Sequence, residues 1–173
     1  MLPKLSLILG GAASGKSVFA EGLVMASPLP RIYVATAQAF DDEMRQKVQK
    51  HLAQRGPNWR TIEAPLDTAD ILPDLPKDAI VLLDCATMWL SNQMLAEKDL
   101  AVEQANLLDA LQACRAHVVV VSNEVGLDVV PENALARRFR DAQGALNQAI
   151  ARQADLAVLV VAGLPMVLKG ELP

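Results

Sequence analysis

A short stretch near the start of the chain has the residue types and the spacing that bind phosphate. It reads GGAASGKS, from Gly10 to Ser17, and matches the pattern G-x-x-x-x-G-K-[S/T]. Glycines let backbone N–H groups turn toward phosphate oxygens, while the Lys16 ammonium reaches the β and γ phosphates and the Ser17 hydroxyl binds Mg²⁺. The strand-like run before it and the helix-like run after it disfavour the alternative, a glycine-rich turn that merely ends a strand. The predicted nucleotide contacts are Gly10, Gly11, Ala12, Ala13, Ser14, Gly15, Lys16 and Ser17.

A carboxylate that suits this loop ends a second apolar run. Asp84 closes the stretch AIVLLD, at the tip of a predicted central strand. In phosphate-loop enzymes an acid at such a position holds Mg²⁺ directly or through water. The alternative is that Asp84 caps the helix that follows. Because the loop already implies a metal, we predict that Ser17 and Asp84 are the magnesium ligands.

The elements that must position these residues alternate along the chain. Continuous apolar runs, typical of strands buried on both faces of a parallel sheet, cover residues 4–9, 31–36, 79–84, 117–123 and 156–162. Helical patterns cover residues 16–26, 41–55 and 100–115, and a last one starts near Pro131 and continues to Ile150. The alternation predicts one α/β domain over residues 1–173, with a mostly parallel sheet and helices on both faces. We expect the Pro- and Asp-rich segment 63–78 to be a surface loop.

Composition excludes several classes of protein. The formal net charge is -4 and only 3% of residues are aromatic, which argues against a general nucleic-acid binder. Cys85 and Cys114 are far apart in the sequence and suit a reducing cytoplasm better than a disulfide scaffold. The longest apolar tract is interrupted by Gly163 and Pro165 and is too short to span a bilayer. We therefore expect a soluble cytoplasmic protein.

Three classes of nucleotide protein fit the phosphate loop. They are a small-molecule kinase or nucleotidyltransferase, a GTPase switch, and a recombination-type ATPase motor. The switch requires an N-K-x-D motif, and the chain has no Asn-Lys pair. The motor would normally have a basic surface and a longer chain. The small-molecule enzyme is the leading class.

Several segments together resemble one enzyme family. In chain order they read GGAASGKS, YVATAQAFDDEM, WRTIEAP, LLDCATMWLSN, VVSNEVGLDVVPENALARRFRDAQGALNQAIA and VAGLPMVLKG. They resemble the bifunctional adenosylcobinamide kinase / adenosylcobinamide-phosphate guanylyltransferase family of cobalamin biosynthesis over nearly the whole chain. The resemblance implies a RecA-like core and a homotrimer.

Two reactions are implied by this resemblance. First, GTP or ATP phosphorylates the hydroxyl of the aminopropanol arm of adenosylcobinamide. Second, GTP guanylylates a histidine of the enzyme, and the GMP passes to adenosylcobinamide phosphate to give adenosylcobinamide-GDP. The alternative is a phosphate-loop kinase of another small alcohol, without covalent guanylylation.

The resemblance also singles out one histidine. In the family, the guanylylated histidine lies in the helix between the D-D-E-M motif and the Trp-Arg-Thr segment, where this chain has only His51. Lys47, His51 and Arg55 form one stripe at four-residue spacing, which would place two cations beside the imidazole. By spacing alone, a solvated basic helix face explains the stripe better. The resemblance reverses that choice and implies that His51 is the nucleophile. His117, at the start of a strand, is expected to be structural.

Further guanine-nucleotide contacts are implied around the same helix. They are Ala35, Thr36, Ala37, Leu52, Ala53, Gln54, Arg55 and Glu63. Glu63 would accept hydrogen bonds from guanine or ribose, unless it is simply a surface carboxylate. The segment RRFRD, residues 137–141, would bind phosphate or a second subunit, or is a plain charged helix face.

The segment SNEVG, residues 122–126, ends a predicted strand beside the phosphate loop. Asn123 and Glu124 would orient Mg²⁺-bound water or the acceptor hydroxyl, or only anchor the loop. Two positions depart from the usual family pattern: Ala13 replaces an arginine of the phosphate loop, and Asp128 replaces a glycine. If Asp128 needs a positive φ, the substitution has a cost. Both departures put the kinase step in more doubt than guanylyl transfer.

Overall fold

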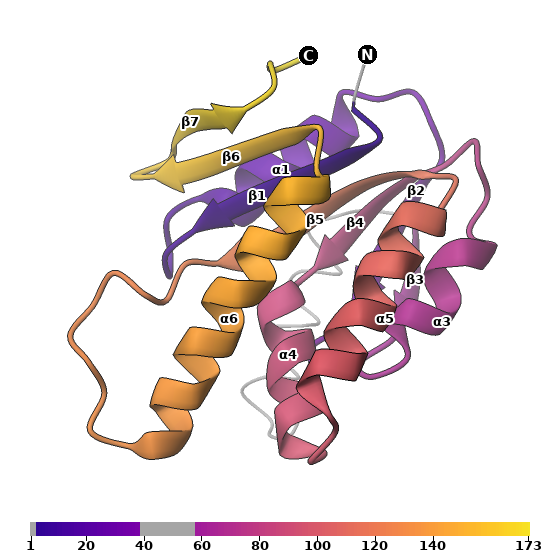
Figure 1. Ribbon diagram of the computed structural model, residues 1–173. Helices are drawn as coiled ribbons and strands as arrows, with labels where there is room; N and C mark the ends of the chain where they lie inside the picture. The colour runs from indigo at the N-terminus through magenta and orange to yellow at the C-terminus, as the bar shows by residue number, and fades with distance from the viewer. Residues whose placement is uncertain (1–2, 39–57) are drawn as a thin grey trace.

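The computed structural model describes residues 3–38 and 58–173, which form one twisted sheet covered by helices (Figure 1). In space the strands follow the order β3-β2-β4-β5-β1-β6-β7. The strands are β1 (Leu5–Gly10), β2 (Arg31–Ala35), β3 (Trp59–Glu63), β4 (Ile80–Asp84), β5 (His117–Asn123), β6 (Leu156–Val161) and β7 (Leu164–Lys169). All pairings are parallel except that of β6 with β7. The fold class predicted from the sequence is therefore confirmed.

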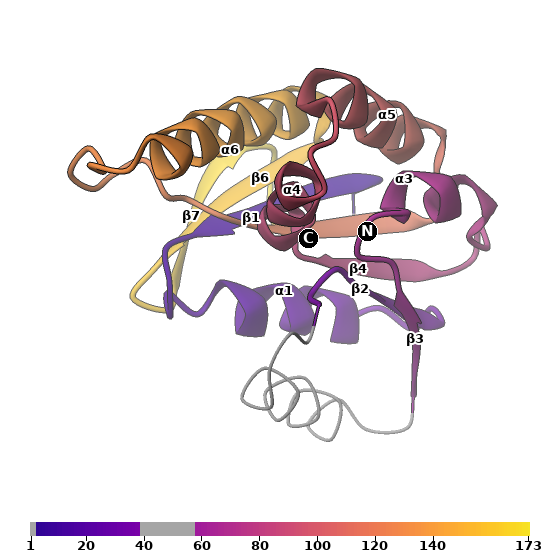
Figure 2. The same cartoon turned by 90° about the horizontal axis from the view of Figure 1, so that it is seen from below.

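Helices cover both faces of the sheet, as predicted (Figure 2). The helices are α1 (Lys16–Met25), α3 (Thr68–Ile71), the 3-10 turn η1 (Leu72–Asp74), α4 (Ala86–Leu95), α5 (Leu100–Ala113) and α6 (Ala134–Gln153). Helix α1 lies on one face, and α4, α5 and α6 lie on the other. Within the described ranges, no helix combines the length and the apolar character that a membrane crossing requires.

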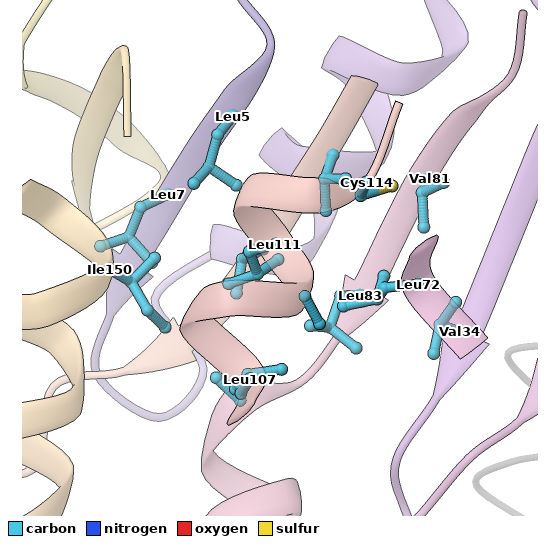
Figure 3. Close-up of a cluster of buried hydrophobic side chains, with 14 of the residues drawn as sticks. Leu5, Leu7, Val34, Leu72, Val81, Leu83, Leu107, Leu111, Cys114 and Ile150 are labelled. Atoms are coloured by element: carbon cyan, nitrogen blue, oxygen red, sulfur yellow. The ribbon is translucent and has the colours of Figure 1, made fainter. Parts of the chain in front are cut away.

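Two apolar layers explain why the central strands are apolar along their whole length. All six residues of β1 are buried, because their side chains alternate between the two faces. Leu7 packs with Leu107 and Ile150 in the cluster under α5 and α6 (Figure 3). Ile8 packs with Val24 in the cluster under α1. The sheet is thereby fixed between two helical layers, and its strand ends are held in place for the site.

Some predicted elements differ from the observed ones. The segment predicted as a surface loop contains α3 and η1, and Thr68 and Leu72 within it are buried, so that prediction was wrong in part. The last helix begins at Ala134 rather than near Pro131, because the Asn133 side chain caps it by accepting hydrogen bonds from two backbone N–H groups. The predicted helix 41–55 lies among residues 39–57, outside the described residues.

Candidate nucleotide-binding active site

The phosphate loop connects the end of β1 to the start of α1 and has the shape of an anion cradle. Ala13 and Gly15 adopt left-handed backbone conformations, with φ of 55° and 92°. The Lys16 ammonium folds back over the loop and donates to the Gly11 carbonyl at 3.0 Å. No side chain caps the ten-residue helix α1, so the N–H groups of its first turn stay available for an anion. The predicted loop therefore has the geometry that phosphate binding needs.

Two glycines of the loop are required by close packing, Gly10 against the end of β6 and Gly15 against the β6–β7 turn. A Cβ at Gly10 would overlap Ser14 Oγ and lie 2.8 Å from the Val160 carbonyl oxygen. A Cβ at Gly15 would lie 3.0 Å from Gly163 Cα. The Gly163 N–H also donates to the Ser14 carbonyl at 2.8 Å. The turn between β6 and β7 thus holds the phosphate loop in place, a role of Gly163 that no sequence motif indicated.

Asp84 ends β4 at the carboxyl edge of the sheet, the edge at which the parallel strands end. One of its carboxylate oxygens, Oδ2, accepts a hydrogen bond of 2.9 Å from the hydroxyl of Tyr33 on β2. Tyr33 is 8% exposed, and its ring makes an edge-to-face contact with Trp59, with centroids 6.4 Å apart. The ring contact fixes Tyr33, and the hydrogen bond from its hydroxyl then orients the Asp84 carboxylate. No sequence pattern pointed to the hydrogen bond, because the two residues are 51 positions apart.

The alternative role of Asp84 as a helix cap is wrong. The N-cap of α4 is Cys85, whose Sγ accepts a hydrogen bond from the Met88 N–H at 3.4 Å. Burial raises the pKa of the Cys85 thiol to about 11, and the nearby negative charge of Asp84 adds to the rise, while Lys16 opposes it. Register on β5 places the two site elements at one edge, since Gly10, where the phosphate loop begins, pairs with Asn123 and Asp84 pairs with Val121.

A buried polar network fixes the end of β5 beside the phosphate loop. Asn123 is the register partner of Gly10, and the Glu124 N–H donates to the Gly10 carbonyl at 3.1 Å. Asn147 on α6 accepts from the Ser122 hydroxyl at 2.6 Å and donates to the Asn123 carbonyl at 3.0 Å. Gln143 donates to both Ser122 and Asn147. The expected position of SNEVG next to the phosphate loop is confirmed. The hydrogen bond to the Asn123 carbonyl anchors its backbone, which agrees with the alternative that Asn123 anchors the loop.

Mg²⁺ bound with nucleotide phosphates needs only one or two carboxylate or hydroxyl ligands from the protein. Ser17 and Asp84 fit that requirement, and no group of three or more His, Cys, Asp or Glu that would form a separate metal cage occurs in the part of the chain that is described. Within the same part, the buried Asn123 Oδ1 and Ser14 Oγ have no hydrogen-bond partner. Polar atoms left unpaired at this edge are what a site for phosphate, metal and water would provide.

The remaining predicted contacts are distributed unevenly. Ala35 is the last residue of β2, and Thr36 and Ala37 follow it at the carboxyl edge. Glu63, the register partner of Ala35, is exposed at the end of β3. The Thr36 side chain is not available for a nucleotide, because its hydroxyl donates to the Cys85 carbonyl and accepts from the Cys85 N–H, each at 2.7 Å. His51 and the run Leu52, Ala53, Gln54 and Arg55 lie outside the described residues.

Three other residues of interest have local roles. His117 lies at the opposite, amino edge of the sheet, where its Nδ1 is 3.1 Å from the Pro3 carbonyl oxygen, in accord with a structural role. Arg137 donates to the Pro131 and Glu132 carbonyls just before α6. Because its guanidinium is used in these local contacts, they favour a plain helix face over phosphate binding for Arg137. Asp128 is not among the described residues with positive φ, so the expected backbone strain is not found there.

The loop and the sheet define the class of this chain: it is a phosphate-loop α/β protein with a RecA-like fold. Its fold is similar to that of the RadB recombinase (TM-score 0.52, 15% identity, covering 91% of this chain and 74% of that one). It is also similar to an ATPase from the type III secretion system of pathogenic bacteria (TM-score 0.59, 9% identity, covering 96% and 57%).

Sequence comparison gives the family. Residues 6–168 match the family described as cobinamide kinase / cobinamide phosphate guanyltransferase, and the chain belongs to it. It is 46% identical over 168 residues to the bifunctional adenosylcobalamin biosynthesis protein CobP of Pseudomonas aeruginosa, covering 95% of this chain and 97% of that protein. It is 43% identical over 180 residues to CobU of Salmonella typhimurium, which has the same descriptive name, covering 94% and 98%.

Proposed function

We propose that this protein is a bifunctional enzyme that phosphorylates adenosylcobinamide and then converts adenosylcobinamide phosphate to adenosylcobinamide-GDP. The observation that carries the proposal is the pairing of a formed phosphate loop with Asp84 at one edge of the sheet, in a chain of this family. The first product is the acceptor for the second reaction, so one nucleotide-binding protein serves both steps.

In the kinase step, the acceptor hydroxyl oxygen attacks the γ-phosphorus, and the bond to the β–γ bridging oxygen breaks. Lys16 stabilises the charge that develops on the phosphate oxygens, and the loop N–H groups bind the β-phosphate. Ser17 and Asp84 would hold Mg²⁺, which neutralises phosphate charge when it is bound. Tyr33 holds Oδ2 of Asp84, and the other oxygen is proposed to bind the metal.

In the guanylylation step, a neutral ring nitrogen of His51 attacks the α-phosphorus of GTP, and the bond to the departing pyrophosphate breaks. The imidazole ring loses its proton, and a P–N bond to GMP remains. A phosphate oxygen of adenosylcobinamide phosphate then attacks the same phosphorus and restores the histidine. Ala35, Ala37 and Glu63 are proposed to contact the guanosine.

The assembly and its setting are also part of the proposal. We expect a homotrimer in the cytoplasm, with no nucleic-acid partner. Two exposed apolar groups suit a subunit interface: Leu164, Met166 and Leu168 on β7, and Leu127, Val129 and Val130 after β5. The net charge of -4 is unfavourable for nucleic-acid binding. Light scattering coupled to size-exclusion chromatography tests the trimer.

The experiment that tests the function uses GTP labelled at the α-phosphate. We expect the label to remain on the denatured protein, to be labile in acid and stable in alkali, and to be absent from His51→Ala. His117→Ala is the matched control, because it removes the other histidine of the chain, and it should retain the label. Release of all nucleotide from denatured wild-type protein would favour the simple kinase instead.

A further inference from the structure

A cavity of about 420 Å³ opens directly beside the phosphate loop. Its walls come from three elements: the phosphate loop from Gly11 to Ser14, the segment after β5 through Glu124 and Leu127, and the end of β6 through Leu159 and Val161. The wall is apolar except at the loop and at Glu124. Gly11, whose carbonyl accepts from Lys16 Nζ, is part of this wall, so the cavity borders the loop that would hold the nucleotide phosphates.

Glu124 is the one ionisable residue in the described lining of this cavity. Its backbone is tied to the phosphate loop by the hydrogen bond from its N–H to the Gly10 carbonyl. Its side chain is oriented by the Gly126 N–H, which donates to Oε1 at 2.7 Å. Among the described residues no donor contacts Oε2, so this oxygen is available to a ligand. The side chain is thus a positioned carboxylate in a wall that it shares with the phosphate loop.

We propose that this cavity takes the aminopropanol arm of adenosylcobinamide and that Glu124 is the general base of the kinase step. Glu124 Oε2 accepts the hydroxyl proton as the hydroxyl oxygen forms its bond to the γ-phosphorus and the β–γ bridging bond breaks. Asp84 is a poorer candidate, since its Oδ2 accepts from Tyr33 and the residue is assigned to the metal. This inference rests on the proposed kinase function.

The apolar lining suits the carbon skeleton of the arm. Leu127, Leu159 and Val161 offer no hydrogen-bonding side chain, and the Ser14 hydroxyl is too weak a base to take a proton, so Glu124 is the acceptor for the proton of the arm's hydroxyl. Ala13, which stands where related chains commonly have an arginine, also lines the cavity. In this chain the position adds apolar surface rather than a second charge.

The test compares Glu124→Gln with the wild type in two assays on the same preparations. Glutamine keeps the size and the Oε1 acceptor for Gly126 but cannot take a proton. We expect kcat for phosphorylation of adenosylcobinamide to fall about 100-fold or more, with KM changed less than about threefold. Covalent labelling by α-labelled GTP and the melting temperature should remain at wild-type values. Glu132→Gln, an exposed residue of the same segment, is the control and should leave both activities unchanged.

Each outcome decides the proposal. If Glu124→Gln retains wild-type kcat, Glu124 only anchors its loop and the proposal is overturned, while the proposed function stands. If wild-type enzyme forms no phosphorylated adenosylcobinamide, the proposed function fails, and this inference fails with it. A second variant, Val161→Phe, narrows the cavity and should raise KM for adenosylcobinamide about tenfold with little change in labelling. An unchanged KM would place the acceptor elsewhere.

Discussion

The two edges of the sheet differ in the polar and charged groups that they carry. At the amino edge, His117 has a backbone partner in Pro3, and the adjoining hollow is lined by apolar residues such as Leu23 and Leu29. At the carboxyl edge, Lys16 and Asp84 accompany the phosphate loop, and Asn123 Oδ1 and Ser14 Oγ are buried without a partner in the described structure; near the amino edge Ser6 Oγ is in the same state. Buried polar atoms without partners are costly, and they persist where a ligand satisfies them. Unpaired atoms alone do not separate the two edges, so it is the phosphate loop with Lys16 and Asp84 that marks the carboxyl edge as the one that binds a ligand.

The largest expected difference between the two edges is in the kinase kcat after replacement of Lys16 or of Lys4. Lys16→Ala removes the ammonium from the phosphate loop and should lower the kinase kcat by about 10³-fold, because the charge developing on the phosphate loses its partner. Lys4→Ala removes an exposed lysine just before β1 and should leave kcat unchanged. Steady-state kinetics on both variants measure the difference. Equal losses would show that the two edges do not differ as described.

The Tyr33 hydroxyl is expected to have the next largest effect. Tyr33→Phe removes the hydrogen bond to Asp84 and should raise the Mg²⁺ concentration for half-maximal activity about 10- to 100-fold. Trp59→Phe replaces the indole that packs against Tyr33 by a smaller ring but leaves the Tyr33 hydroxyl in place. The Mg²⁺ requirement of this variant should therefore stay near that of the wild type. Titration with Mg²⁺, and Mn²⁺ binding followed by electron paramagnetic resonance, measure this directly. Unaltered metal affinity in the Tyr33→Phe variant contradicts the positioning role.

A smaller difference, in nucleotide affinity, is expected between alanine variants of the glycines at the two ends of β7. Gly163 and Gly170 both have positive φ, so alanine at either position costs about 1–2 kcal/mol. Gly163→Ala disturbs the turn that holds the phosphate loop and should weaken nucleotide binding up to about tenfold. Gly170→Ala should be the more destabilising change, because its Cβ overlaps the Asp155 carbonyl, yet nucleotide affinity should be unaffected in the folded protein. Fluorescent-nucleotide titrations and thermal melts distinguish the two results.

The smallest expected effect is at His117. His117→Ala removes its contact with the Pro3 carbonyl and should lower the free energy of unfolding by about 1 kcal/mol. Both enzymatic activities should be retained at the carboxyl edge. Urea denaturation measures the loss of stability, and the two activity assays measure whether catalysis is retained. A loss of activity in the folded variant would show that the amino edge contributes to catalysis.

Sequence patterns were sufficient for the sheet interior and the phosphate loop. The central strands are buried on both faces, so their residues form continuous apolar runs, and the loop has a fixed motif. Strand β3 escaped prediction because it is an edge strand in which Arg60, Thr61 and Glu63 are exposed. Strand β7 was missed because the single tract LAVLVVAGLPMVL turns back at Gly163, and all six residues of β7 are exposed.

Side-chain partners across the sheet were less accessible to sequence reasoning. The Tyr33–Asp84 hydrogen bond and the contact of Gly163 with Ser14 join residues far apart in the chain, and neither is part of a local pattern. Thr36 was expected to contact the nucleotide, but its hydroxyl is taken up by Cys85. Such pairings depend on the order of strands in space, which apolar periodicity does not encode.

The hydrogen bond from Gly163 to Ser14 also affects how the enzyme matures on the ribosome. The residues that cradle the triphosphate are translated first, but the turn that clamps them emerges about 150 residues later. The strand that leads into the loop, β1, also pairs only with β5 and β6, so a nascent chain lacks both the sheet neighbours of the loop and its clamp until late in synthesis. Catalytic competence arrives late in synthesis, so incomplete chains are not expected to sequester GTP.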